Sequence, residues 1–285
     1  MTISGNTGVK GDWTVSVVIP THNRAELCLR AIASALQQTA PPLEVIVCDD
    51  RSTDGTAEAV TALYGLDPRV RLVRRQSGPK GPGATRNAAI HEARGSLIAF
   101  LDDDDEWFPE KLATQLRQMG SEPCLVASNA LNTSTHDSYF VAPSDSDISP
   151  DELAMSNPMI ASSVVVPRAA LVAAGAFSES VSLLGFDDYD MWLRLANDGL
   201  RMRRSSQPQL QYRDLGEDKL GNKLSFYSVQ GVAVQLRQLA RCPFTRRSYR
   251  GVARSLYFAA SVYLGKQARA RTTARIARAF APTFK

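Results

Sequence analysis

The sequence predicts an α/β protein with a mostly parallel central sheet, flanked by helices and followed by a helical C-terminal appendage. Four apolar segments alternate with segments of helical pattern over residues 15–101. Two of these apolar segments run directly into aspartates, and no acidic residue follows Asp218. Alternation of this kind is typical of parallel sheets whose strands are joined by right-handed crossover connections.

The expected elements follow from hydrophobic periodicity and from helix-start signals. Buried strands are predicted at residues 15–19, 44–48, 70–73, 97–101 and 163–166, and helices at 24–37, 52–64, 84–93, after Pro109 and at 188–197. Asn23 is the expected N-cap of the first helix, because its side chain can accept a hydrogen bond from a free backbone N–H. Residues 124–163 indicate only short strands and loops.

Bulk properties indicate a soluble chain with a sizeable core. The chain has 285 residues, of which 44% are hydrophobic and 22% charged, as in globular proteins. Its four cysteines lack metal-ligand spacing, which favours a reduced, cytoplasmic protein. Residues 1–13 are polar and lack the apolar segment of a signal peptide. No apolar run approaches the roughly 20 residues that span a bilayer.

Charge divides the chain into a polar segment at 1–13, an acidic domain at 14–218 and a basic helical region at 219–285. Residues 219–285 contain 14 Lys and Arg and no Asp or Glu. Periodic arginines, such as Arg247, Arg250 and Arg254, predict a cationic amphipathic helix, which can contact an anionic inner membrane face. The alternative is that these helices pack on the acidic domain, whose charge they would complement. Nucleic-acid binding is disfavoured because no reader motif is present.

Acidic residues follow two of the predicted strands, at Asp49-Asp50 and at Asp102–Asp105. Ligands of open α/β sheets bind beyond the carboxyl ends of the strands, so both sets are expected in one crevice. Mg²⁺ and Mn²⁺ prefer oxygen ligands, commonly one or two carboxylates together with substrate phosphates. The alternative for residues 102–105 is a solvated acidic turn before the next helix. For residues 49–50 it is helix capping by the nearby Ser52 or Asp54.

A third acidic set, Asp187, Asp188 and Asp190, precedes or opens a predicted amphipathic helix. A carboxylate within hydrogen-bond reach of a reacting hydroxyl can act as a general base. The alternative is the ordinary preference of acidic residues for a helix N-terminus.

Five segments taken in order resemble the family 2 inverting glycosyltransferases of GT-A fold. They are VSVVIPTHN at 15–23, VCDDRSTDGT at 47–56, GATRN at 83–87, FLDDDD at 100–105 and FDDYDMWLR at 186–194. The resemblance covers about residues 14 to 215. It implies transfer of a sugar from a nucleotide-diphosphate sugar, with UDP favoured, to a saccharide or lipid-linked saccharide acceptor. Such chemistry belongs to polysaccharide, cell-surface glycan or glycolipid synthesis.

The resemblance also implies roles for individual residues. Asp188 matches the catalytic base and Asp104 the ligand of a divalent Mn²⁺ or Mg²⁺ cofactor. Asp187 stands where many relatives have Glu, and it is expected with Trp192 near the acceptor. The expected nucleotide-binding residues are Pro20, Thr21, His22, Asn23, Asp50, Arg86, Asp102 and Asp103. Asp105 has no clear part in this scheme.

Two other functions fit some of these features. A sugar-phosphate nucleotidyltransferase also uses a nucleotide and a metal, but it would have a Gly-rich loop where residues 20–24 contain none. A non-catalytic nucleotide-sugar-binding protein would not need both Asp104 and Asp188. Oligomerisation is compatible with the sequence, and the sugar, the base and the acceptor are not readable from it.

Overall fold

The first half of the central sheet is parallel, as predicted. The computed structural model describes residues 13–140, 144–213, 224–241 and 250–257. Its first four strands are β1 (Val15–Thr21), β2 (Glu44–Asp49), β3 (Val70–Arg74) and β4 (Leu97–Phe100). They lie in the order β3-β2-β1-β4, and every pair among them is parallel. All four strands lie within two residues of their predicted positions.

The second half of the sheet is mixed. It contains β5 (Glu106–Trp107), β6 (Leu125–Asn132), β7 (Ser146–Asp147), β8 (Val165–Pro167) and β9 (Met202–Tyr212). Strand β8 is antiparallel to both β4 and β6, whereas β6 and β9 are parallel to each other. The two reversals bring the carboxyl ends of β6 and β9 to the sheet edge where β1, β2 and β4 also end.

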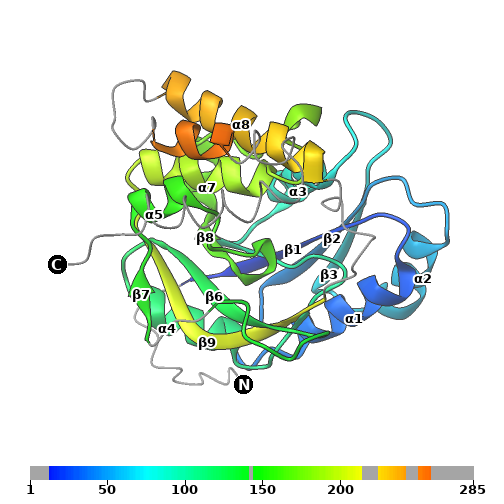
Figure 1. The fold of residues 1–285 in the computed structure, drawn as a ribbon. Helices are drawn as coiled ribbons and strands as arrows, with labels where there is room; N and C mark the ends of the chain where they lie inside the picture. Colours follow the sequence, from blue (N-terminus) through cyan, green and yellow to red (C-terminus); the bar gives the residue numbers. More distant parts are fainter. Residues whose placement is uncertain (1–12, 141–143, 214–223, 242–249, 258–285) are drawn as a thin grey trace.

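Helices cover both faces of the sheet (Figure 1). One face carries α1 (Ala25–Leu36), α2 (Thr56–Tyr64) and α4 (Lys111–Met119). The other face carries α3 (Pro82–Glu92), α5 (Pro150–Met155), α6 (Arg168–Ala173), α7 (Asp187–Asn197) and α8 (Leu224–Arg241), with short 3₁₀ turns η1 (Ala161–Ser163) and η2 (Val181–Leu183). The expected α/β fold with a central sheet between helices is therefore confirmed.

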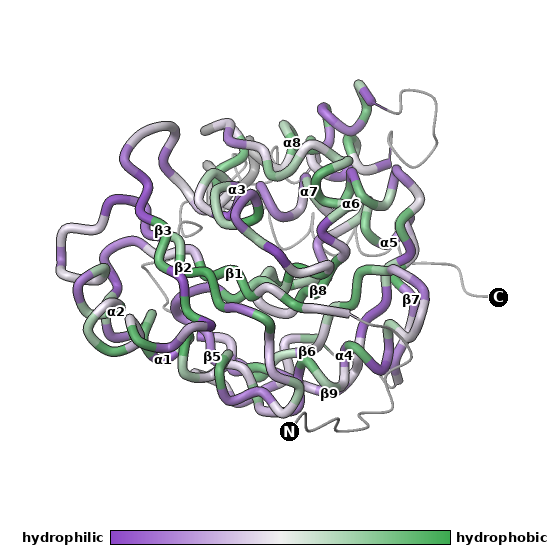
Figure 2. The backbone as a smooth tube through the Cα atoms, turned by 180° about the vertical axis from the view of Figure 1, so that it is seen from behind, coloured by the Kyte–Doolittle hydropathy of each residue, from purple (hydrophilic) through white to green (hydrophobic). Residues whose placement is uncertain are grey.

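The strands are hydrophobic throughout because both of their faces are buried. Val18 and Phe100 pack under α3 and α7, while Val17 and Ile19 pack under α1 and α4. All four side chains are fully buried. Figure 2 shows the hydrophobic colouring concentrated in the central strands. Continuous apolar runs are the expected pattern for a sheet covered on both sides.

Three local predictions were wrong. Asn23 does not cap α1: its backbone is left-handed (φ 54°), and its Oδ1 accepts a hydrogen bond from the backbone N–H of Thr53 at 2.7 Å. The second helix begins at Thr56 rather than at residue 52, because Asp54 instead accepts hydrogen bonds from the backbone and side chain of Thr56. Residues 124–163 contain the long strand β6 and the helix α5.

The helical prediction for the C-terminal region at 219–285 is confirmed at 224–241 and 250–257, and its remainder lies outside the described residues. That remainder includes Arg247 and the arginines beyond residue 270. The polar segment at residues 1–12 also lies outside them. Among the described helices, none is both long enough and apolar enough to cross a membrane.

Candidate active site

The four aspartates after β4 form a turn with two partly exposed and two buried side chains. The backbone N–H of Asp105 donates to the Asp102 carbonyl at 3.1 Å, which closes the turn. The side chains of Asp102 and Asp104 are 32% and 20% exposed, so both carboxylates reach solvent. Asp103 and Asp105 are buried. The alternation leaves the carboxylates of Asp102 and Asp104 accessible to solvent and buries those of Asp103 and Asp105.

Two arginines that lie far apart in the sequence compensate the charge of this turn. Arg24, just before α1, donates from Nη1 to Asp103 Oδ1 at 3.0 Å and to Asp104 Oδ2 at 2.7 Å. Arg86, on α3, donates from Nη2 to Asp102 Oδ1 at 2.5 Å. Sequence reasoning missed Arg24, although it directly follows the motif that ends at Asn23. Its position on the turn beyond β1 could have indicated a partner for the acids beyond β4.

The turn still carries more negative charge than its protein partners offset. Burial raises the pKa of Asp104, and the nearby Asp102 raises it further against the opposing effect of Arg24. Burial likewise raises the pKa of Asp103 to about 6. Burial and the neighbouring Asp104 hold the pKa of Asp105 well above its usual range, and its Oδ2 has no hydrogen-bond partner within the described structure.

A hard divalent cation fits this turn. Asp102 and Asp104 present carboxylate oxygens, the donors preferred by Mg²⁺ and Mn²⁺, and a cation beside them would relieve the repulsion between them. In the described part of the chain, no group of three or more His, Cys, Asp or Glu side chains gathers as a complete metal site. The remaining ligands would therefore be phosphate oxygens of a substrate and water, as is common for Mg²⁺.

The expected nucleotide-binding residues of β1 and β2 lie side by side. Thr21 is opposite Asp49 in the parallel register, and the Asp50 N–H donates to the Thr21 carbonyl at 2.9 Å. Thr21 Oγ1 donates to Asp103 Oδ2 at 2.8 Å, which ties β1 to the acidic turn. His22 Nδ1 lies 2.9 Å from the Asp50 carbonyl oxygen, and Pro20 is buried within β1.

Asp50 is 5% exposed, and its carboxylate has several protein partners. Arg75 Nη1 and Arg51 Nη2 each donate to its Oδ1 at 2.9 Å, and the Gly81 N–H donates to its Oδ2 at 3.1 Å. Arg75 directly follows β3, and Arg51 follows β2 with only Asp50 between them. The importance of these two arginines was not predicted. They hold the Asp50 carboxylate in place at the sheet edge and fix the loop that leads into α3.

The third acidic set opens α7 and is joined to the acidic turn by Arg86. Arg86 Nη1 donates to Asp187 Oδ2 at 3.0 Å, while Nη2 of the same side chain holds Asp102. Arg86 is 5% exposed and lies 5.6 Å from the ring centroid of Phe177. Arg86 was expected near the base or the diphosphate. The structure places it beneath the site, between two carboxylates.

Gly83 allows α3 to approach α7 this closely. A Cβ atom at position 83 would lie 2.8 Å from the Ser178 carbonyl oxygen and 3.2 Å from Asp187 Oδ2. Real Cβ atoms do not come so close to backbone oxygen, so a larger residue would push the two helices apart. Gly83 of the GATRN segment therefore allows the close approach that the Arg86–Asp187 contact requires.

Asp188 lies beside Asp187 and has the electrostatics of a general base. Asn157 Nδ2 donates to its Oδ2 at 3.3 Å, and the Tyr189 N–H donates to its Oδ1 at 2.6 Å. Burial, and next to it the charge of Asp187, raise the pKa of Asp188 to about 7. A carboxylate with a pKa near 7 is suited to proton transfer at neutral pH.

Trp192 and Asp190 belong to the core rather than to the acceptor side. Trp192 is fully buried, with its ring centroid 6.1 Å from that of Phe100 and 6.0 Å from that of Phe177. Its expected contact with an acceptor is therefore not supported by its position. Asp190 is fully buried and forms an ion pair with Arg194 at 2.9 Å. An amphipathic helix pattern does not tell which of its aromatic residues faces inward.

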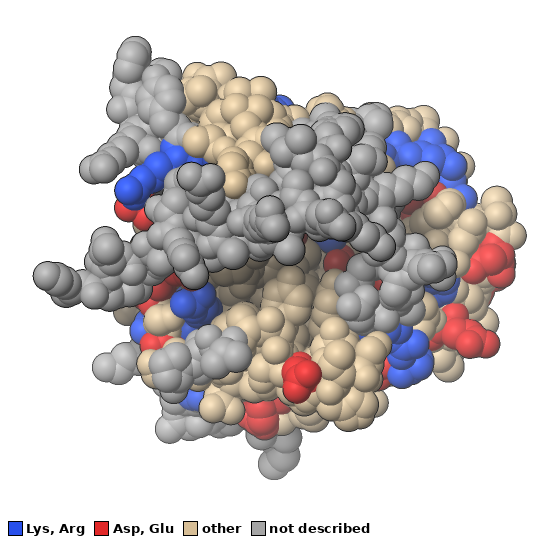
Figure 3. Space-filling view, in the orientation of Figure 1, with Lys and Arg blue, Asp and Glu red and all other residues tan. Residues whose placement is uncertain are grey.

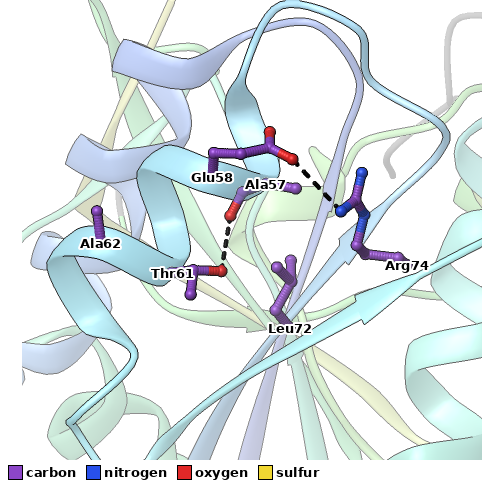
Figure 4. A pocket seen from close by; sticks show the side chains of 6 residues that line it. All are labelled: Ala57, Glu58, Thr61, Ala62, Leu72 and Arg74. Atoms are coloured by element: carbon purple, nitrogen blue, oxygen red, sulfur yellow. Dashed lines mark hydrogen bonds and ion pairs between the residues drawn. The ribbon is translucent and has the colours of Figure 1, made fainter.

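The described surface has hollows away from this site. One of about 340 Å³ lies between α2 and the edge strand β3, lined by Thr61 and Leu72 among others, with Glu58 and Arg74 paired across it (Figure 4). It contains no cluster of catalytic groups. Figure 3 shows a separate recess in the middle of the viewed face, between the upper helices and the lower strands.

Comparison with known proteins decides the family. The sequence profile described as "Glycosyl transferase family 2" matches residues 16–178. The chain belongs to glycosyl transferase family 2. This family assignment confirms the resemblance, although the matched range ends before the fifth segment at 186–194. It gives no support to a nucleotidyltransferase.

Two curated proteins are similar to the chain over different lengths. The chain is 28% identical over 206 residues to the UDP-Glc:alpha-D-GlcNAc-diphosphoundecaprenol beta-1,3-glucosyltransferase WfaP of Escherichia coli, covering 70% of this chain and 76% of that protein. It is 38% identical over 118 residues to the chondroitin synthase of Pasteurella multocida. That match covers 41% of this chain but only 12% of the synthase.

Solved structures of glycosyltransferases share the fold. S. aureus TarS 1-349 in complex with UDP-GlcNAc superposes with a TM-score of 0.68 at 18% identity, covering 86% of this chain and 72% of that one. The mannosyltransferase PcManGT from Pyrobaculum calidifontis, in complex with GDP-Man and Mn²⁺, gives a TM-score of 0.58 at 18% identity over 94% and 83% of the two chains. These likenesses confirm the GT-A type of fold.

Proposed function

We propose that this family 2 protein is a metal-dependent inverting glycosyltransferase that moves a sugar from a UDP-sugar to a hydroxyl of a lipid-linked saccharide. The observation that carries the proposal is the connection of the acidic turn to Asp188 through Arg86 and Asp187. A group that can hold a diphosphate and a group that can take a proton are thereby fixed relative to each other. UDP-GlcNAc in the TarS complex and the undecaprenol-linked substrate named for WfaP support the substrate classes.

In this proposal the nucleotide lies along the ends of β1, β2 and β4. Thr21, His22 and Asp50 line the side of the base, and Asp102 faces the ribose. Asp104 would hold Mn²⁺ or Mg²⁺, which would stabilise negative charge on the departing diphosphate. Asp103 and Arg24 stabilise the conformation of the acidic turn, because the buried Asp103 carboxylate accepts hydrogen bonds from both Thr21 and Arg24.

The acceptor side is built on α7. Asp188 takes the proton of the acceptor hydroxyl as its oxygen attacks the anomeric carbon. The bond from that carbon to the diphosphate oxygen breaks on the opposite side, so the configuration of the sugar inverts. Asn157 and the Tyr189 N–H orient the carboxylate for this proton transfer. Acceptors linked to a membrane lipid would place the enzyme at the inner face of the membrane, in the cytoplasm.

The test measures UDP release from UDP-glucose and UDP-N-acetylglucosamine with Mn²⁺, with and without a short-chain polyprenyl-diphosphate-GlcNAc acceptor. The substitution Asp188→Asn should retain UDP binding but lower acceptor-dependent UDP release by a factor of 100 or more, about the contribution of a general base. Asp198→Asn is the matched control, because Asp198 is an exposed residue at the other end of α7. Full activity of Asp188→Asn would refute the assignment of the base. Binding of UDP-sugars without any turnover in the wild type would instead favour a non-catalytic binding protein.

A further inference from the structure

The outer face of the C-terminal helices combines exposed apolar and basic side chains. We call it the cationic face; it consists of Leu236, Ala240 and Arg241 on α8 and of Arg250, Ala253, Leu256 and Tyr257 on the helical residues 250–257. Leu236 is 48% exposed and Leu256 is 51% exposed. Leucines that are this exposed on two neighbouring helices do not contribute to the core of the catalytic domain.

The inner face of the same helices is fixed on the catalytic domain. Gln235 is buried, and its Nε2 donates to the Ala154 carbonyl oxygen at 3.2 Å and to the Tyr189 hydroxyl at 3.0 Å. Gln238 Nε2 donates to Asp190 Oδ1 at 3.3 Å. A Cβ atom at Gly251 would lie 2.2 Å from Gln235 Oε1, so residues 250–257 pack directly on α8. These contacts determine which side of each helix is turned outward.

The positive charge of these helices is not compensated by described carboxylates. No Asp or Glu follows Asp218 in the sequence. In the part of the chain that the structure describes, none of Arg237, Arg241, Arg250 and Arg254 pairs with an acidic side chain; Arg237 donates to the Ser178 hydroxyl at 2.9 Å. Burial lowers the pKa of Arg194, and the positive charges of Arg241 and Arg237 oppose its ionisation further. The cations are therefore crowded.

We propose that the cationic face rests on an anionic phospholipid surface. Basic residues interleaved with exposed leucines on the outer side of helices match the chemistry of a headgroup region, which attracts cations and accepts apolar side chains. The sequence offered two alternative roles for these helices, which were membrane contact and packing on the catalytic domain. Both roles are compatible, because they use opposite sides of α8.

The location of the cationic face indicates what membrane contact would do for the enzyme, an inference that rests on the proposed function. Helix α8 packs directly on α7, where Gln235 and Gln238 contact residues within two positions of Asp188. An enzyme resting on the bilayer through α8 would thus hold its acceptor side close to the lipid. The sugar of a lipid-linked acceptor could then reach Asp188 while its polyprenyl chain stays in the membrane.

The experiment is sedimentation of the full chain with vesicles of phosphatidylcholine alone or of phosphatidylcholine mixed with phosphatidylglycerol. We expect binding to the mixed vesicles that weakens with added salt, and no binding to phosphatidylcholine alone. The double substitution Arg241→Gln/Arg250→Gln should weaken binding roughly thirty-fold, the effect of two surface cations. Leu236→Asn/Leu256→Asn should also weaken it.

The matched control is Arg69→Gln/Arg117→Gln, which removes two exposed arginines that lie outside the C-terminal helices. This control should bind like wild type. Wild-type protein that stays in solution with mixed vesicles at low salt would overturn the proposal. So would equal binding by Arg241→Gln/Arg250→Gln, or binding to a short RNA duplex that anionic vesicles cannot displace.

Turnover is measured separately in the absence of vesicles, as UDP release from the UDP-sugar. The substitutions on the cationic face lie outside the active site and should leave this rate unchanged. Loss of vesicle binding with intact UDP release would confirm that the cationic face positions the enzyme on the membrane and takes no part in turnover. Vesicle binding by a wild type that turns over no UDP-sugar would support the membrane surface and contradict the proposed function.

Discussion

Arg86 and Asp187 form a buried ion pair between α3 and α7, with 3.0 Å from Nη1 to Oδ2 and only 5% of each side chain exposed. The same guanidinium holds Asp102 at the end of β4. Arginine suits this place because its planar fork can serve two carboxylates at once and stays charged when buried. The pair thus connects the side that would bind the donor to the side that would bind the acceptor.

Replacing Arg86 by methionine should destabilise the protein by about 3 kcal/mol, because it leaves Asp187 buried with no cation beside it. The free energy of unfolding is measured by urea denaturation at neutral pH. Arg117→Met, at an exposed site on α4, is the control and should change stability by less than about 0.5 kcal/mol. A loss for Arg86→Met no larger than that of the control would show that the bridge is not needed for the fold.

The pH dependence of kcat/KM should report the protonation of Asp188. A general base acts only when ionised, so activity should rise with pH through about 7, where burial and Asp187 place the pKa of Asp188. Replacing Asp187 by asparagine removes a negative neighbour that opposes ionisation. The pKa of Asp188 then falls, and the acid limb of the profile should move to lower pH. An acid limb that stays in place or moves to higher pH would contradict this coupling.

The sequence allowed the first half of the fold and most of the site to be predicted, for a clear physical reason. Strands β1 to β4 are buried on both faces and appear as continuous apolar runs, and the acids at their ends have no role in a core. Strands β6 and β9 were not predicted because their residues alternate less regularly. Strand β6 contains Ser128 and Asn129, and its register with β9 shifts at Asn129.

Pairings between distant residues could not be predicted from one sequence. Arg24, Arg75 and Asn157 contact Asp103, Asp50 and Asp188 from up to 79 positions away. Only the folded chain brings these partners together. The same limit explains why Trp192 was misplaced: its burial depends on Phe100 and Phe177, which come from other elements.

Replacing Asp104 by alanine should remove metal-dependent binding of the donor. Asp104 is the more exposed of the two carboxylates held by Arg24. We expect the stabilisation of wild type by UDP with Mn²⁺ in thermal unfolding to disappear in Asp104→Ala. Chelation of the metal should have the same effect on wild type. Asp67→Ala, at an exposed loop, serves as the control. A Mn²⁺-dependent shift retained in Asp104→Ala would exclude Asp104 as the ligand.

Glu44 lies at the end of the sheet opposite to the candidate site. Its ionisation should make the free energy of unfolding depend on pH in the acidic range. Burial alone would raise its pKa, but hydrogen bonds from Ser16, the Arg94 N–H and Arg71 lower it to about 2. Because the pKa is lower in the folded state, this stabilisation is complete above the unfolded pKa of roughly 4.3 and is lost as pH falls toward 2. Glu44→Gln should lose on the order of 3 kcal/mol at pH 7 and much less at pH 2.5 or below. Equal losses at both pH values would contradict an electrostatic origin.

Gln235 should affect catalysis by Asp188 without contacting that residue. Its side chain joins α8 to the Tyr189 hydroxyl, and Tyr189 directly follows Asp188 on α7. Gln235→Leu removes two buried hydrogen bonds, so we expect a loss of about 1 to 3 kcal/mol in the free energy of unfolding. It should also lower kcat for UDP release while leaving the Kd for UDP with Mn²⁺ unchanged, because the described hydrogen bonds of Gln235 and Gln238 lead to the helix of the base and not to the acidic turn. Ala240→Ser, on the exposed side of the same helix, should change neither quantity. A Gln235→Leu variant with weaker UDP binding and normal kcat would place the influence of α8 on the donor side instead.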